Sequence, residues 1–209
     1  MNRIVTIVMV LFCFNSMAQS KGKDDFGNET YFNIGYVLPN MDHVNNYNPQ
    51  NVATKKMAAE IELGAIWNFR QVKLSNIARL GITADFISLG CNYVTFQEAG
   101  YTSISKVITG RGSLNVGPNI AIRCFKDGYV DLFAKARPTI VYDDIKTFKY
   151  KESGGMGFGF RYSIGANFRW RMLMIGGEAV YGGAKAIDYM NFTADVPDNY
   201  FKMKLGYIF

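Results

Sequence analysis

The sequence predicts an all-β protein, an eight-stranded antiparallel up-and-down transmembrane β-barrel. Three observations lead to this fold class. Apolar and polar residues alternate with a period of two in eight segments. Short and long connections alternate between these segments, and glycines share one face of the strands with the charges. Aromatic residues make up 15% and charged residues 19% of the 209 residues, a composition that excludes a mainly disordered chain.

The N-terminus has the pattern of a secretory signal peptide. Arg3 precedes an eleven-residue apolar run, Ile4 to Phe14, and Ser16 and Ala18 are small residues suited to cleavage after Ala18. A transmembrane helix is the alternative, but such a run rises only about 16 Å, roughly half of a bilayer core. We therefore expect a signal peptide at 1–18, a short periplasmic N-terminal segment at 19–28 and an outer-membrane β-barrel at 29–209.

Eight segments after residue 28 have one continuous apolar face each. Near 29–38 this face is Phe32, Ile34, Tyr36 and Leu38, and near 56–69 it is Met57, Ala59, Ile61, Leu63, Ala65 and Trp67. Near 77–90 it is Leu80, Ile82, Ala84 and Phe86, and near 112–125 it is Leu114, Val116, Ile120, Ile122 and Cys124. Near 129–142 it is Val130, Leu132, Ala134, Ala136, Ile140 and Tyr142, and near 155–170 it is Met156, Phe158, Phe160, Tyr162, Ile164, Ala166, Phe168 and Trp170. Near 171–182 it is Leu173, Ile175, Ala179 and Tyr181, and near 200–209 it is Phe201, Met203, Leu205, Tyr207 and Phe209. Such alternation is typical of strands with two different environments.

The connections alternate between short and long. The short ones lie near 71–76, at Lys126-Asp127-Gly128 and at 170–171, and we expect Gly128 to supply the positive φ of a tight hairpin. The long ones lie near 39–55, 91–111, 143–154 and 183–199. All long connections then lie at one end and both termini at the other, as in barrels with short periplasmic turns and long extracellular loops.

Charges of both signs occupy the face that carries the glycines. The interior ion-pair candidates are Glu60, Glu62, Arg79, Asp85, Arg123, Asp131, Lys135, Arg137, Arg161, Arg169, Glu178, Lys202 and Lys204. Small residues suit a crowded eight-stranded interior, and opposite charges stabilise one another there. We therefore place this face inside and predict a closed, ion-paired interior without an open channel. A soluble lipocalin-like ligand-binding barrel, with the opposite orientation, is the alternative.

Aromatic residues flank the apolar face at both ends. This predicted girdle comprises Trp67, Trp170, Tyr207 and Phe209 toward the short turns, and Tyr142, Tyr181 and Phe201 toward the long connections. The two interfaces of a bilayer select such residues. Ordinary enrichment of aromatic residues in strands is the alternative explanation.

The chain resembles the small OmpA/OmpX-type outer-membrane barrels, in the version described as porin-family or outer-membrane β-barrel-domain proteins of Bacteroidetes-type bacteria. The resemblance covers essentially the whole chain after the signal peptide. Its most specific part is the strand 200–209, where Tyr207 and Phe209 are similar to the family's C-terminal assembly signal, although Lys204 stands where the family has glycine and Gly206 is displaced by two. The resemblance implies an outer-membrane location, contact with membrane lipid and lipopolysaccharide, and recognition by the outer-membrane assembly machinery.

Residues that could carry enzymatic chemistry are few. His43 is the only histidine, and no motif joins it to the other candidates in the long connections, Asp42, Ser103, Ser105, Asp143 and Asp144. Lipid A-modifying barrels resemble this architecture and use a histidine at the extracellular rim. Lipid A modification is therefore an alternative function. The glycine run 154–159 precedes no helix, as a phosphate site would require. We expect no catalytic residue, no cofactor and no metal site.

Two further features bear on partners and redox state. Cys91 and Cys124 fall at opposite ends of neighbouring strands, so we expect two free thiols. In the third long connection, Lys146, Lys149 and Lys151 alternate with aromatic residues, a pattern suited to lipopolysaccharide phosphates. A solvated extension of the strand is the alternative.

The function expected from the sequence is non-enzymatic, with extracellular loops that mediate surface or partner interactions, including contact with a protein partner. An accessory subunit of a secretion or assembly complex is the alternative. We expect no nucleic-acid partner for an exported barrel.

Overall fold

The computed structural model describes Phe26, Asn28 and residues 29–39, 52–97, 104–146, 153–188, 193–197 and 199–209. The strands are β1 (Glu29–Pro39), β2 (Val52–Lys73), β3 (Ala78–Gln97), β4 (Ile104–Phe125), β5 (Gly128–Lys146), β6 (Ser153–Trp170), β7 (Leu173–Asp188), β8 (Thr193–Pro197) and β9 (Tyr200–Ile208). In these ranges, no helix is long and apolar enough to cross a bilayer. The expected signal peptide and His43 lie outside the described residues.

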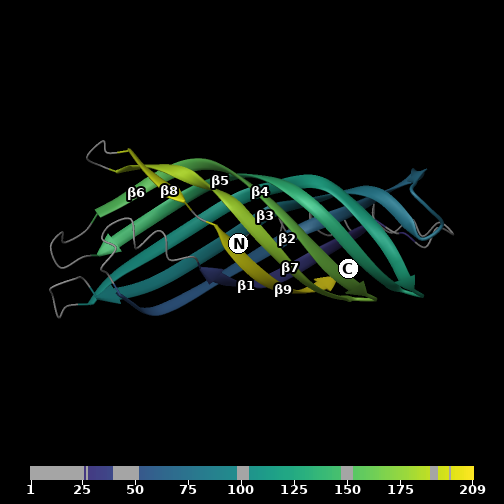
Figure 1. The fold of residues 1–209 in the computed structure, drawn as a ribbon, viewed down its shortest axis with the longest axis horizontal. Helices are drawn as coiled ribbons and strands as arrows, with labels where there is room; N and C mark the ends of the chain where they lie inside the picture. The colour runs from purple at the N-terminus through teal and green to yellow at the C-terminus, as the bar shows by residue number, and fades with distance from the viewer. Residues whose placement is uncertain are drawn as a thin grey trace, which may run out of the picture.

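All strands pair antiparallel in one sheet that closes into a barrel. Each of β1 to β7 pairs with its neighbour in sequence, and β9 closes the ring between β7 and β1. The short β8 pairs with Gly183–Ile187 of β7, while β9 pairs with Leu173–Val180 of the same strand. Together β8 and β9 therefore occupy one position in the ring. The predicted up-and-down barrel of eight positions is confirmed, with its last strand interrupted (Figure 1).

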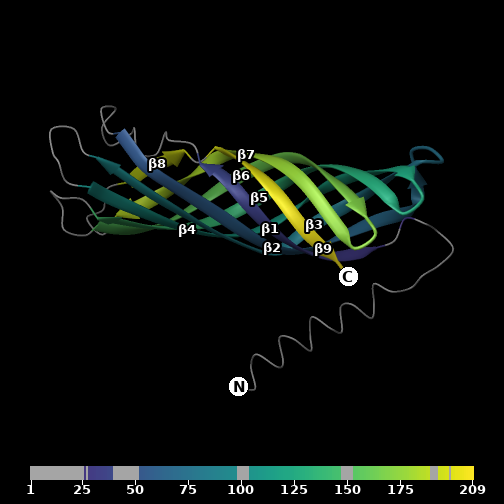
Figure 2. The ribbon, with the colours of Figure 1, turned by 90° about the horizontal axis from the view of Figure 1, so that it is seen from below.

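The tight turns gather at one end of the barrel, and the C-terminus lies toward this turn end (Figure 2). In the β4–β5 turn, Asp127 has a φ of 64°, and in the β6–β7 turn, Arg171 has a φ of 52°. The expectation that Gly128 supplies the positive φ was wrong, because the short polar side chain of Asp127 tolerates that conformation. Gly128 is needed for another reason: a Cβ there would lie 2.4 Å from the Phe125 ring.

The strands extend well beyond the expected boundaries at the other end, called here the loop end. β3 and β4 continue to pair as far as Gln97 and Ile104, inside a region assigned to a connection. The register shifts between Asp85 and Ser88, so that Phe86 and Ile87 both face outward. This bulge breaks the alternation of β3, and past it the strand carries polar residues on both faces. A period-two pattern of hydrophobicity cannot show such strands.

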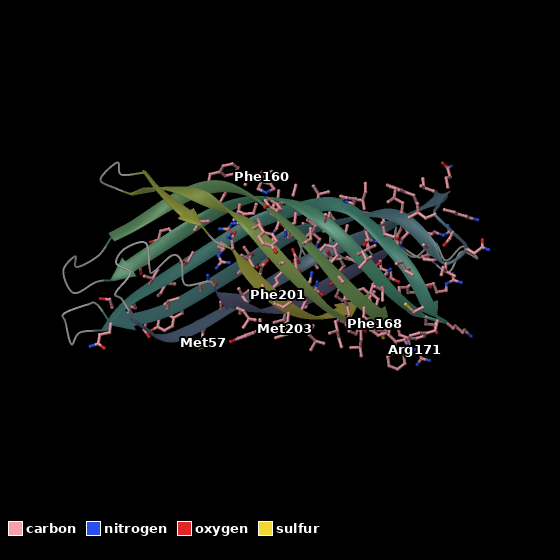
Figure 3. All side chains as sticks on the ribbon, viewed as in Figure 1. Met57, Phe160, Phe168, Arg171, Phe201 and Met203 are labelled. Atoms are coloured by element: carbon pink, nitrogen blue, oxygen red, sulfur yellow. The ribbon has the colours of Figure 1, made fainter. Side chains whose placement is uncertain are left out.

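The two faces of the wall have opposite chemistry. Leu205 is 61% and Ile34 56% exposed on the outside, whereas Glu178 and Lys202 are 0% exposed inside. Figure 3 shows Phe160 at the outer margin of the ribbon and Arg171 near the turn end. The charged face is thus the interior face, and the soluble lipocalin-like alternative, which requires the opposite orientation, was wrong. Inward glycines make room for the packed interior: a Cβ at Gly165 would lie 2.5 Å from the Phe133 ring.

Candidate functional site: the ion-paired interior

The centre of the barrel holds a network of three carboxylates and three cations. Arg137 of β5 lies between two acids, with Nη2 2.5 Å from Glu60 Oε1 and Nη1 2.8 Å from Glu178 Oε1. Lys202 of β9 contacts both of these acids, at 2.8 Å and 3.3 Å, and also contacts Glu62. Lys204 lies 2.8 Å from Glu178 and 3.7 Å from Glu62. The six side chains come from four strands, and their charges sum to zero.

Neutral donors complete the hydrogen bonds of this central network. The hydroxyl groups of Ser88 and Tyr200 donate to Glu60 over 2.6 Å and 3.0 Å, and the Asn33 side-chain amide donates to Glu62 over 3.3 Å. On the loop side, the guanidinium of Arg111 lies 4.7 Å from the centre of the Tyr200 ring. A buried carboxylate is stable only when its lone pairs are occupied, which these donors and the cations achieve.

A second cluster lies next to the central network. Lys135 Nζ lies 3.0 Å and 2.9 Å from the two oxygens of Asp85. Asn115 donates to Asp85 over 2.7 Å, and the Tyr31 hydroxyl donates to the same carboxylate. The ring of Phe133 joins the two clusters, since Lys135 Nζ and Lys204 Nζ lie 4.7 Å and 4.6 Å from its centre.

A third cluster lies at the turn end. Arg169 of β6 binds Asp131 of β5 and also Glu29 at the start of β1, and its guanidinium lies 5.0 Å from the centre of the Tyr129 ring. Nearby, the guanidinium groups of Arg79 and Arg123 lie 4.9 Å and 4.8 Å from the centre of the Phe26 ring. Ionic and aromatic contacts therefore cross the end of the barrel.

Apolar layers separate and cap these clusters. Tyr31, Ile66, Met174 and Ile208 form one buried group, and Val37, Ala58, Val180 and Tyr200 form another. The side chains of both groups point into the barrel, so the interior is not polar throughout. Paired ions and apolar groups therefore both line the described interior of the barrel.

The structure places the thirteen predicted interior residues on the inward face, Arg123 with partial exposure and the other twelve buried. It brings ten of them into the central network, the second cluster and the Arg169–Asp131 pair. Arg79 and Arg123 meet at Phe26 instead. Arg161 lies opposite Arg137 on the neighbouring strand and is buried.

Sequence reasoning missed several interior residues. Arg111 falls in a stretch that the pattern predicts to be a connection, and Glu29 is not among the predicted interior charges. Tyr31, Tyr129 and Phe133 are aromatic residues on the inward face, where only small and polar residues were expected. The alternation along each strand could have predicted that these three side chains face inward, because each is next to an apolar residue that faces outward. Phe26 precedes the first strand and had no such signal.

The outward face carries the predicted girdle residues on both sides of an aliphatic band. Trp170, Tyr207 and Phe209 are exposed toward the turn end, where Trp67 is partly covered by Phe86, with ring centres 5.7 Å apart. Tyr142, Tyr181 and Phe201 are exposed toward the loop end. Tyr181 stacks on Tyr162, with ring centres 5.5 Å apart. The band between them includes Ile34, Ile61, Ile175 and Leu205, which are neighbours across β2, β1, β9 and β7.

Other candidate chemistry is limited within the described ranges. Cys91 and Cys124 are both free and exposed. The part of the chain with assigned positions contains no group of three histidine, cysteine or acidic side chains that could hold a metal ion. Ser105 is buried on the inward face of β4, while His43, Asp42 and Ser103 lie outside the described residues.

No protein-family model and no curated protein matches the sequence. The fold is similar to that of Ail, the attachment invasion locus protein of Yersinia pestis, with a TM-score of 0.50 and 14% identity over 88% of this chain and 100% of that one. Ail in complex with the heparin analogue sucrose octasulfate matches with the same identity and coverage and a TM-score of 0.51. The outer-membrane protease OmpT from Escherichia coli, at 11% identity over 87% and 93%, gives a TM-score of only 0.44. The similarity to Ail shows a shared β-barrel fold.

Proposed function

We propose that this protein is a non-enzymatic outer-membrane β-barrel whose extracellular loops bind polyanionic surface molecules. The observation that carries the membrane location is the orientation of the wall. Exposed Phe, Ile, Leu and Met side chains surround the barrel, while buried Glu, Asp, Lys and Arg fill it. A bilayer requires an apolar outer surface, and an edgeless sheet satisfies its backbone hydrogen bonds without water.

The filled interior directs function to the barrel ends. Because paired ions and apolar layers occupy the described interior, the wall is better suited to hold loops than to pass solutes. The third long connection contains Lys146, Lys149 and Lys151, which supply cations for phosphate or sulfate groups. Support by analogy comes from Ail, a barrel of similar fold at 14% identity that has been solved with a heparin analogue.

The membrane assignment predicts a specific behaviour on gels. In the isolated outer-membrane fraction, we expect the unheated protein to migrate differently from the boiled protein, because a closed barrel resists detergent until it is heated. The fraction is analysed by electrophoresis with and without boiling. Recovery of the protein only from the soluble fraction, with no shift on boiling, would contradict the assignment.

The loop assignment predicts weaker polyanion binding when lysines are removed. The K146Q/K149Q/K151Q variant should elute from immobilised heparin at lower salt than the original protein, because each cation removed weakens a screened electrostatic contact. A matched variant, K73Q/K126Q/R171Q, removes the same charge from exposed residues at the turn end. Equal loss in both variants would point to net charge rather than to the loop, and no loss in the first would exclude these lysines.

A further inference from the structure

The turn end of the barrel is crossed by residues that precede the first strand. Phe26 is 4% exposed and lies with Ala121 and Tyr129 in a buried group. Its ring centre is 5.3 Å from that of Tyr129, and its ring is faced by the guanidinium groups of Arg79 and Arg123. These partners come from β3, β4 and β5, so one aromatic side chain contacts three strands of the wall.

Two more residues hold this crossing segment at other points of the rim. The side-chain oxygen of Asn28 accepts a hydrogen bond of 3.1 Å from the backbone nitrogen of Asn68 in β2. Glu29 pairs with Arg169 in β6, and Arg169 also binds Asp131 in β5. We call Phe26 and Asn28 the N-terminal strap, which joins the wall at Glu29 of β1. Its contacts and those of Glu29 extend from β2 to β6, so the strap crosses the opening of the barrel at the turn end.

The strap is attached less firmly than the wall. The ladder of β1 begins at Glu29, which pairs with Ile66, so Phe26 and Asn28 lie outside the strand pairing. They are held by side-chain contacts, and segments of this kind open locally at a smaller free-energy cost than paired strands. Ala121 packs with Phe26, and its cross-strand neighbour is Asp131; both are 0% exposed. Withdrawal of the ring would bring water to these residues while the barrel stayed closed along its length.

We propose that the N-terminal strap is a plug that opens and closes the turn end of the barrel interior by local unfolding, with Phe26 as its sealing residue. When it opens, water and small solutes reach the compartment beneath it, which Arg79, Arg123 and Asp131 line, from the periplasmic side. This device is independent of what the extracellular loops bind.

Thiol accessibility tests the plug directly. In a C91S/C124S background, Ala121→Cys reports on the compartment beneath Phe26, and Ser163→Cys, buried deeper in the wall, reports on the rest of the interior. The folded protein in detergent micelles is treated with an anionic methanethiosulfonate. We expect Phe26→Ala to speed modification at position 121 by about tenfold, the size expected for loss of a local seal. Modification at position 163 should not change.

Conservative variants distinguish the effect of losing the Phe26 ring from a general loss of stability. Phe26→Tyr retains the aromatic face, so position 121 should stay as protected as in the original protein. Phe26→Leu serves if Phe26→Ala does not give a folded band on unheated gels, and it should speed modification at 121 as well. Equal modification rates at 121 with and without the ring would overturn the proposal. So would equal acceleration at 121 and 163, which would indicate loosening of the whole barrel.

Discussion

Replacing Arg137 by methionine should lower the free energy of unfolding by about 3–5 kcal/mol, the usual cost of breaking a buried ion pair from one side. Arg137 contacts Glu60 and Glu178, and all three are almost completely buried. Methionine fills much of the space but leaves the central network with one more carboxylate than cations. Equilibrium unfolding in urea, with the barrel in lipid vesicles, measures the change through the fluorescence of Trp67 and Trp170.

A second substitution in the same network shows whether charge imbalance is the cause. R137M/E178Q leaves Glu60 and Glu62 against Lys202 and Lys204, so the network is neutral again, and part of the lost stability should return. Arg171→Met is the matched control, since Arg171 is exposed in a turn and its loss should cost little. A cost below about 1 kcal/mol for R137M would mean that water or rearrangement satisfies both acids, contrary to a closed interior.

Replacing Leu205 by arginine should destabilise the barrel by about 2–4 kcal/mol in lipid vesicles, the range for a cation facing the middle of a bilayer. Leu205 is 61% exposed and lies between Ile34 and Ile175 on the outer wall. In a water-soluble protein, the same substitution at so exposed a site would have almost no effect. Urea unfolding in vesicles therefore distinguishes contact with lipid from contact with water.

The control for this substitution lies outside the apolar band. Asn76→Arg introduces the same side chain in the exposed bend between β2 and β3, and we expect a change within about 0.5 kcal/mol. If L205R were as mild as N76R, the apolar outer wall would not be buried in a membrane.

Much of the fold was predictable because one face of each strand is continuously apolar. The period of two identified β1 to β7 and β9, and the shared position of glycine and charge identified the interior. The hydrophobic pattern could not locate the extensions of the strands at the loop end. One example is β3 beyond its bulge, where polar residues occupy both faces. Nor could it find β8, a five-residue strand whose pairing depends on β7 already being in place.

The interior was predictable in composition but not in connectivity. The sequence shows which charges face inward, since that follows from strand phase. Which acid meets which cation depends on the tilt of the strands around the barrel, which brings Arg137 of β5 across the interior to Glu60 of β2. Phe26 lies outside every strand, and its position follows only from the cationic groups that the closed barrel gathers around it.

The closing strand has a consequence for how the chain reaches this structure. Tyr31, near the start of β1, pairs with Ile208 of β9, so the ring closes only when β9 is in place. Contacts between such distant parts of a chain form slowly, because the intervening loop must be ordered first. Until then β1 and β7 expose unpaired edges that can join other chains. A chain lacking β9 would therefore be a substrate for proteolysis rather than a smaller barrel.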